Sequence, residues 1–390
     1  MLDRVKNLLT PAARSDVPPF MVMDVVAAAT RLEAEGHRII RMEMGQPAAG
    51  APRTAIEAAR AALDGPLGYT EALGIGSLRA RIARHYHDVH GVSVDPARIV
   101  VTTGSSSGFI LSFLTLFQPG DRVGLANPGY PPYRHILTAL GCEPVLIETN
   151  EKTRWAITPE TLLAAHARNK LAGVIVASPA NPTGTMMTKE ALSELIAVSE
   201  NAGIRFISDE IYHGLDYAFP AATALALSGN ALVINSFSKY FCMTGWRIGW
   251  VVAPEPFVRP LERLQGNLAI SVPTLSQIAA EAAFEGRDEM EAIKHGYEDN
   301  RRILIESFPK IGLDKFLPAD GGFYLYADIS KFSDDSFDFA NRMLQEAHVS
   351  ATPGIDFDPL DGKHFLRFCY AGSQSDMHEA VARIGRWLHP

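Results

Sequence analysis

Lys239 and Arg247 stand near the middle of the chain, just after a short apolar run that is typical of a buried strand. Removing an ammonium from water is costly and lowers its pKa, so a lysine in such a place can become a nucleophile that forms a Schiff base with a carbonyl. Ser236 and Ser238, together with Arg247, are donors that suit a phosphate. The joint prediction is a lysine that holds pyridoxal phosphate. A surface lysine beside an arginine that binds an unrelated carboxylate is the alternative.

A further phosphate contact is predicted at Gly104, Ser105 and Ser106. They lie in a small polar turn, 104–108, between a predicted strand and a helix expected at 109–117. The N–H groups and positive end of a helix favour anions, and small residues allow them to come close. Taken alone, these residues could equally be an ordinary helix N-cap.

Asp209 and Tyr212 follow another buried run, at 204–208. A carboxylate in this place can pair with a protonated pyridine nitrogen and so keep the cofactor ring an electron sink. Tyr212 could donate its hydroxyl to the ring oxygen of the same cofactor. An aspartate that caps a helix is the competing interpretation of Asp209.

Three loops that contain proline supply more candidates. Asn181 lies in an Asn-Pro-Thr-Gly turn after a predicted strand, where its amide could face the same site. Tyr130 lies in Asn-Pro-Gly-Tyr-Pro-Pro-Tyr and offers a flat surface for an aromatic ring. Gly45, in Gly-Gln-Pro, lets the backbone approach a ligand closely. Each loop by itself could be a plain turn.

These residues need a scaffold that brings strand ends together. Short apolar or β-branched runs alternate with helical patterns along the chain, at 98–103, 122–126, 144–147, 173–177, 204–208, 232–235 and 248–253. The alternation predicts an α/β fold, with a mostly parallel seven-stranded sheet between layers of helices. Ligands bind beyond the carboxyl ends of the strands in such sheets, which is where most of the candidates fall.

A smaller α+β domain is expected from both ends of the chain. After Pro254 the pattern turns helical, and a long helix at 288–308 leads to strands at 321–328 and 364–371 and helices at 337–347 and up to Trp387. A helix at 20–35 and a strand at 39–44 precede the large domain. We therefore expect 1–45 to be an arm and helix that join the small domain, 46–286 to be the large cofactor-binding domain, and 287–390 to be the small domain.

The composition is that of an enzyme-sized globular protein. The 390 residues are 47% hydrophobic and can bury a large core, and the net charge of −8 without a basic run argues against nucleic acid as a partner. No apolar stretch has the length of a membrane helix and the first residues lack a signal-peptide core, so we expect a cytoplasmic protein. The cysteines, Cys142, Cys242 and Cys369, are scattered, which predicts core thiols and no disulfide or metal site.

Taken in order, eight motifs resemble those of the class I and II aminotransferases, pyridoxal-phosphate enzymes of the fold-type I group. They are GQP, GYTEALGIGSLR, TTGSSSG, NPGYPPY, SPANPTG, SDEIY, SFSKYFCMTGWRIGW and HFLRFCYA. The likeness covers the chain from about Arg31 to its end. It implies that an amino group moves between an amino acid and a 2-oxo acid by a ping-pong mechanism.

The resemblance also implies a role for each candidate. Lys239 would be the Schiff-base lysine and the catalytic residue, Asp209 the partner of the pyridine nitrogen, and Tyr130 the aromatic that stacks on the ring. Arg367 would clamp the substrate α-carboxylate, with Gly45 and Asn181 beside it. The implied donors to the ring oxygen are Tyr212 and Asn181, and the implied phosphate ligands are Gly104, Ser105, Ser106, Ser236, Ser238 and Arg247.

Tyr69 matches a family residue that reaches the phosphate of the neighbouring subunit, which implies a homodimer with shared active sites. Some alternatives stay open. A β-lyase or synthase on the same fold shares these motifs and breaks a different bond. Ser236-x-x-Lys239 also spells a serine-nucleophile motif, although the motifs that accompany it elsewhere are missing. A non-catalytic regulator with the cofactor fold is a further alternative.

Substrate choice is the least determined property. Dicarboxylate-specific relatives carry a second arginine, and the segment between Leu264 and Gly286 contains none. Aspartate is therefore disfavoured but not excluded. Phe20, Met21 and Ile270 could line an apolar side-chain pocket, or they could belong to the core.

Overall fold

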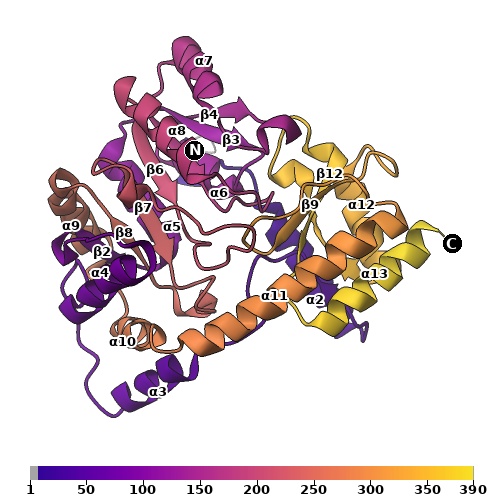
Figure 1. The fold of residues 1–390 in the computed structure, drawn as a ribbon, viewed down its shortest axis with the longest axis horizontal. Coiled ribbons are helices and arrows are strands. Elements are labelled where there is room, and N and C mark those ends of the chain that lie inside the picture. The colour runs from indigo at the N-terminus through magenta and orange to yellow at the C-terminus, as the bar shows by residue number, and fades with distance from the viewer. Residues whose placement is uncertain (1–7, 390) are drawn as a thin grey trace.

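A twisted sheet of seven strands forms the centre of the computed structural model, which describes residues 8–389 (Figure 1). The strand order is β2-β8-β7-β6-β5-β3-β4, and only β8 runs antiparallel to its neighbours. The α/β prediction is thereby confirmed. The strands are β2 (Ile99–Thr102), β3 (Arg122–Asn127), β4 (Glu143–Glu148), β5 (Gly173–Ala177), β6 (Arg205–Asp209), β7 (Leu232–Ser236) and β8 (Gly249–Val252).

Helices cover both faces of this sheet because its strands are apolar on both sides. In β2, Ile99 and Val101 enter one core and Val100 enters the other. The Val100 face packs against α5 (Gly104–Leu116), α6 (Pro131–Ala139) and α9 (Glu255–Ala269). The opposite face packs against α3 (Arg53–Ala62), α4 (Gly76–His90), α7 (Pro159–Asn169), α8 (Lys189–Asn201) and α10 (Thr274–Ala283).

A separate core lies at the other end of the molecule. It surrounds a small antiparallel sheet of β11 (Thr352–Pro353), β12 (Phe365–Cys369) and β9 (Tyr324–Asp328), with α12 (Ser336–Arg342) and α13 (Gln374–Leu388). Helix α2 (Met21–Ala34) leads to β1 (Ile40–Arg41), which pairs with β10 (Val349–Ser350), so both ends of the described chain meet here.

Helix α11 (Arg287–Ser307) connects the two regions, as Figure 1 shows. Its Met290 is buried in a core of the large sheet, whereas Ile303 and Leu304 are buried in the core of the small one. The domain boundaries near residues 45 and 286 stay a prediction, and the first seven residues of the expected arm lie outside the described residues.

Two local predictions were wrong. The polar segment 104–108 is not a turn, since α5 begins at Gly104. Gly108 packs against the sheet, where an added Cβ would lie 3.3 Å from the side chains of Ile234 and Val251, so close packing offsets the low helix propensity of glycine. The strand expected at 39–44 is limited to β1, because Met42 beyond it bonds to the backbone of both Ser350 and Cys369.

The cysteines are buried and unpaired, as expected from their spacing. Across residues 8–389, no helix combines the length and apolar character that a membrane crossing requires.

Candidate active site

The carboxyl ends of β5, β6 and β7 meet at one edge of the large sheet, and the predicted residues converge there. Asp209 ends β6, Ser236 ends β7, and Asn181 follows β5 by a short loop. Parallel neighbours end at the same edge, so residues far apart in the sequence become close in space.

Lys239 lies in the turn that follows β7, and its amine reaches the backbone of Gly45. Nζ donates to the carbonyl of Gly45 at 2.6 Å and lies 5.6 Å from the centre of the Tyr212 ring. Although part of the side chain remains accessible, burial of the amine is the main reason that its pKa falls from 10.5 to about 8. Arg367 and Arg247 lower the pKa further and Asp209 opposes them. Burial is thus the main cause, as the sequence analysis expected for a lysine after a buried strand.

A compact anion site lies at the start of α5. The guanidinium of Arg247 rests against Gly104, where a Cβ would come within 2.4 Å of Nη2, so only glycine leaves room for it. The Ser236 hydroxyl donates to the Ser238 hydroxyl at 2.8 Å. Neither Ser105 nor Ser106, in the first turn of α5, hydrogen-bonds through its hydroxyl to a described residue. A guanidinium, a helix N-terminus and free hydroxyls are the donors that a phosphate needs.

Asp209 is buried at the end of β6, with 3% of its surface exposed. One carboxylate oxygen accepts from the backbone N–H of Ile211 at 3.1 Å, and the other accepts from the hydroxyl of Tyr133. Burial raises its pKa to about 6, although both hydrogen bonds oppose the rise. Residues 211–214 form a turn, so Asp209 caps no helix. A cationic partner would favour the ionised carboxylate and lower this pKa again.

Aromatic hydroxyls surround the space above Lys239. Tyr212 and Tyr324 share a hydrogen bond of 2.7 Å between their hydroxyls, and burial raises the pKa of both. Tyr130 packs edge-on against Tyr133, with ring centres 5.2 Å apart, and against Phe20 at 6.1 Å. Phe20 therefore lies at the edge of the site, as the sequence allowed.

Arg367, on β12, is buried with 2% of its surface exposed. Its guanidinium donates to the Asn181 side chain at 2.9 Å and to the Thr352 hydroxyl at 3.1 Å, and it lies 4.4 Å from the centre of the Tyr324 ring. Among residues 8–389, its Nε has no hydrogen-bond partner. No carboxylate neutralises this buried cation within 4 Å in the described part of the chain, so the site is prepared for an anion.

Gly45 lies between Lys239, after β7 of the large sheet, and Tyr324, on β9 of the small sheet. An added Cβ at this position would fall 1.8 Å from the Tyr324 hydroxyl oxygen, so a side chain here would displace that ring. The glycine therefore permits its own carbonyl to meet Lys239 and the ring of Tyr324 to approach Tyr212.

Two of the predicted phosphate ligands lie at the margin of the candidate site. Tyr69 is 82% exposed and makes no described hydrogen bond to the rest of the set, and Ser106 is exposed as well. Tyr133 and Tyr324 received no role from the sequence. Tyr324 lies in the strand that was expected at 321–328. Tyr133 lies three residues after Tyr130 in NPGYPPY, which was the available signal.

The serine-nucleophile alternative requires Ser236 to pair with Lys239, and the structure does not show such a pair. The Ser236 hydroxyl interacts with Ser238 and with the carbonyl of Ile248, whereas Lys239 is bonded to Gly45. Among the described residues, no group of three or more His, Cys, Asp and Glu is arranged to hold a metal ion.

Comparison with known proteins agrees with this geometry. Residues 37–384 match the family model of aminotransferase class I and II. The chain therefore belongs to the aminotransferase class I and II family. Members of this family are transferases that use pyridoxal phosphate and act on small amino and keto acids, and this protein is an aminotransferase.

Similar proteins cover almost the whole chain. The valine–pyruvate aminotransferase of Mycobacterium tuberculosis is 47% identical, over 100% of this chain and 99% of its own. A crystal structure of an aminotransferase from the same organism superposes with a TM-score of 0.95, at 47% identity, and covers 97% of this chain and 99% of that one. The crystal structure of a putative aminotransferase from Silicibacter pomeroyi superposes with a TM-score of 0.92 at 49% identity, and it covers 97% of this chain and 99% of that one.

The environment of Lys239 predicts a pH at which its amine becomes reactive. With a pKa of about 8, the amine becomes progressively neutral, and so reactive, as the pH rises through 8. Reactivity in the cofactor-free protein should therefore reach half its maximum near pH 8. Competitive labelling with acetic anhydride, read by peptide mass spectrometry, measures this. Arg367→Met removes a nearby cation and should shift the midpoint upward. A midpoint near 10.5 in the unmodified sequence would contradict the argument.

Proposed function

We propose that this aminotransferase binds pyridoxal 5′-phosphate through Lys239 and transfers the amino group of a neutral, apolar amino acid to a 2-oxo acid. The observation that supports it most is the position of one interior amine, with a pKa of about 8, among a buried carboxylate, a helix N-terminus with an arginine, and a buried arginine without a carboxylate. Each of these groups has binding capacity that the described protein leaves unused.

The residues fit the cofactor. The phosphate would be held by Arg247, the first turn of α5 and the Ser236 and Ser238 hydroxyls. The Asp209 carboxylate would pair with the pyridine nitrogen, which explains why a buried acid is kept there. Tyr130 would lie against the ring, and Tyr212 with Asn181 would face its oxygen. When bound, the cofactor supplies the electron sink that stabilises a carbanion at the substrate Cα.

Lys239 would then move the proton. In its neutral form Nζ can take the proton from the substrate Cα and later return one, and an amine with a pKa of about 8 is suited to both steps near neutral pH. The 2-oxo acid product leaves before the second oxo acid enters, so the proposal includes ping-pong kinetics.

Arg367 would hold the substrate α-carboxylate. Its guanidinium is already fixed by Asn181 and Thr352 and packed against Tyr324, so little side-chain freedom is lost when the substrate binds. A planar donor group matches the planar carboxylate and orients the Cα toward Lys239.

The proposed donor side chain is apolar. A relative that is 47% identical over the whole chain is named a valine–pyruvate aminotransferase, and Phe20 packs against Tyr130 at the edge of the site. The segment between Leu264 and Gly286 contains no arginine for a second carboxylate. Ile270 is half exposed at the end of α9, outside the core of the single chain.

We further propose a homodimer in which Tyr69 contributes to the neighbouring site. Its 82% exposure in the single chain leaves the phenol free for such a contact. The same arrangement would cover the exposed residues at the start of α5.

Lys239→Ala should remove both covalent attachment of the cofactor and amino transfer. After incubation with pyridoxal phosphate and reduction with borohydride, peptide mass spectrometry should find the cofactor on Lys239 of the original sequence and nowhere on the variant. Lys310→Ala, an exposed lysine replacement, is the matched control. Normal turnover by the Lys239 variant would refute the proposal.

Arg367→Ala should weaken substrate use and leave cofactor binding intact. Loss of one partner of a buried ion pair costs about 3 kcal/mol, so kcat/KM for the amino donor should fall roughly 100-fold. Arg367→Lys should recover part of the loss, and Arg302→Ala, an exposed arginine on α11, should change nothing. Release of the cofactor from Arg367→Ala would show that this arginine belongs to the cofactor site.

Substrate preference follows from the missing second arginine. With pyruvate as acceptor, valine should give a kcat/KM at least about tenfold above that of aspartate, because a second carboxylate would lose its hydration without gaining a counter-charge. Phe20→Ala should reduce the preference, and Leu360→Ala, an exposed position, should not. Faster transfer from aspartate would overturn the assignment.

A further inference from the structure

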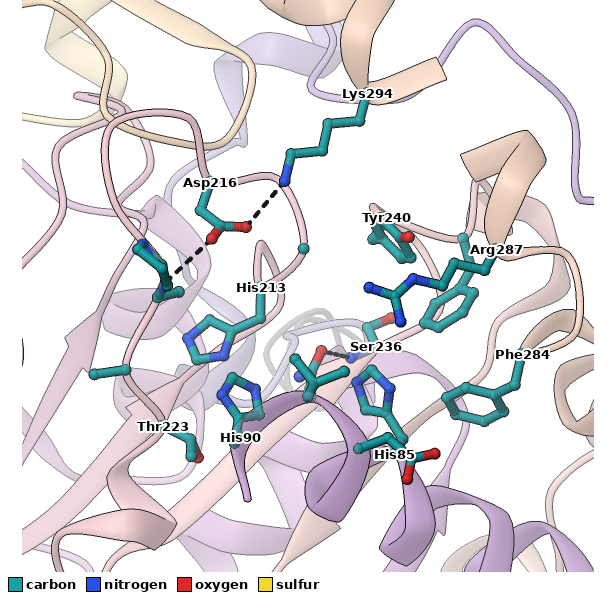
Figure 2. A pocket seen from close by; sticks show the side chains of 18 of the residues that line it. His85, His90, His213, Asp216, Thr223, Ser236, Tyr240, Phe284, Arg287 and Lys294 are labelled. Carbon is teal, nitrogen blue, oxygen red and sulfur yellow. Dashed lines mark hydrogen bonds and ion pairs between the residues drawn. The ribbon is translucent and has the colours of Figure 1, made fainter. Parts of the chain in front are cut away.

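A second pocket, of about 490 Å³, lies between α4, the loop 213–223 and the beginning of α11. We call it the histidine pocket, after His85, His90 and His213, which lie side by side in it (Figure 2). Its volume is within the range of small-molecule sites. Neither Lys239 nor Arg367 lines it, although it shares Ser236 with the candidate active site, so it is a separate space beside that site.

Its imidazoles have unused hydrogen-bonding capacity. His213 is buried, and its Nε2 bonds to the Ser178 carbonyl at 3.1 Å, while Nδ1 makes no described hydrogen bond and lies 3.5 Å from a carboxylate oxygen of Glu210. No ring nitrogen of His85 or His90 bonds to a described residue. Burial lowers the pKa of His85 to about 3 and of His90 to about 4, so both rings are neutral at pH 7 and each offers one donor and one acceptor.

The charges around the pocket favour an anion. Asp216 is paired with Lys294 at 3.3 Å, and Glu291 accepts from the Tyr240 hydroxyl at 2.6 Å. Arg287, in contrast, has no carboxylate within 4 Å among residues 8–389, and Figure 2 shows its guanidinium extending toward the middle of the pocket beside Tyr240. Two further acids lie nearby: Asp88 is 3.5 Å from His87, and the buried Glu210 is 3.5 Å from Nδ1 of His213. Each of these acids has a polar neighbour, while the Arg287 cation is available.

One wall is flat and apolar. Phe284 packs against Phe241, with ring centres 5.0 Å apart, and the guanidinium of Arg81 lies 4.4 Å from the Phe284 ring centre. Ala221 and Ala222 add small apolar surface on another side. Phe284 is 7% exposed and the Arg81 guanidinium covers its ring, so a planar apolar body at this wall gains mainly by leaving water.

We propose that the histidine pocket binds a small aromatic carboxylate, whose anionic group pairs with Arg287 and whose ring packs beside Phe284. The neutral imidazoles supply N–H donors to the same carboxylate. This inference does not depend on the substrate or cofactor of the active site.

Benzoate is the probe, and calorimetric titration of the cofactor-loaded protein is the measurement. The protein carries Arg367→Ala, so that the active-site arginine cannot bind the probe. Saturable binding of one benzoate per chain is expected. Adding Arg287→Ala should weaken this binding at least tenfold, whereas adding Arg302→Ala, an exposed arginine on the same helix, should leave it unchanged.

A second variant tests the position of the ligand independently of charge. Ala222→Trp should fill the pocket and abolish benzoate binding while the unfolding temperature stays within a few degrees. The proposal is overturned if the Arg367→Ala protein binds no benzoate, or if binding is equally tight with Arg287→Ala. If Lys239 did not acquire the cofactor, the proposed function would be refuted. Benzoate binding could still be measured on the cofactor-free protein, so the two proposals fail independently.

Discussion

The burial of one amine beside two arginines is the constraint on which the active site depends. Lys239 can be neutral near physiological pH because water is excluded from Nζ, and Arg367 and Arg247 reinforce the effect. Arg367 and Arg247 stay cationic, and they would repel each other and a protonated Lys239 without anions nearby. In the proposed function a phosphate beside Arg247 and a substrate carboxylate beside Arg367 would supply those anions. Among the predicted site residues the acid is Asp209, which is buried.

Rigidity of the surroundings gives this arrangement its precision. The site is built on the ends of β5, β6 and β7 and on the start of α5, all fixed by cores on both faces of the sheet. Tyr324 and Arg367 come from β9 and β12, which are anchored in another core. Gly45 and Gly104 allow the parts to touch, since a methyl group at either position would collide with Tyr324 or Arg247. Because these donors are held in place before the ligand binds, little free energy is spent on reorganising them when it does.

The segment from Asn235 to Phe241 faces two spaces. Ser236 and Lys239 belong to the candidate active site, whereas Asn235, Ser236, Tyr240 and Phe241 also line the histidine pocket. The Trp250 indole, on neighbouring β8, donates to the Tyr86 hydroxyl at 3.0 Å, and its ring packs against Phe237 of this segment with ring centres 5.0 Å apart. The two spaces are therefore adjacent and share Ser236.

The sequence by itself determined the alternation of strands and helices and the set of polar residues at strand ends, because apolar periodicity and turn residues are local signals. It also indicated Lys239, Asp209 and Arg367 through motifs. Only the tertiary structure decided which groups touch: Tyr133 with Asp209, Tyr324 with Tyr212, and Arg367 with Asn181, pairs separated by 76, 112 and 186 residues. It likewise decided that α5 begins at Gly104. These properties depend on how distant segments pack and exclude water, which no local pattern records.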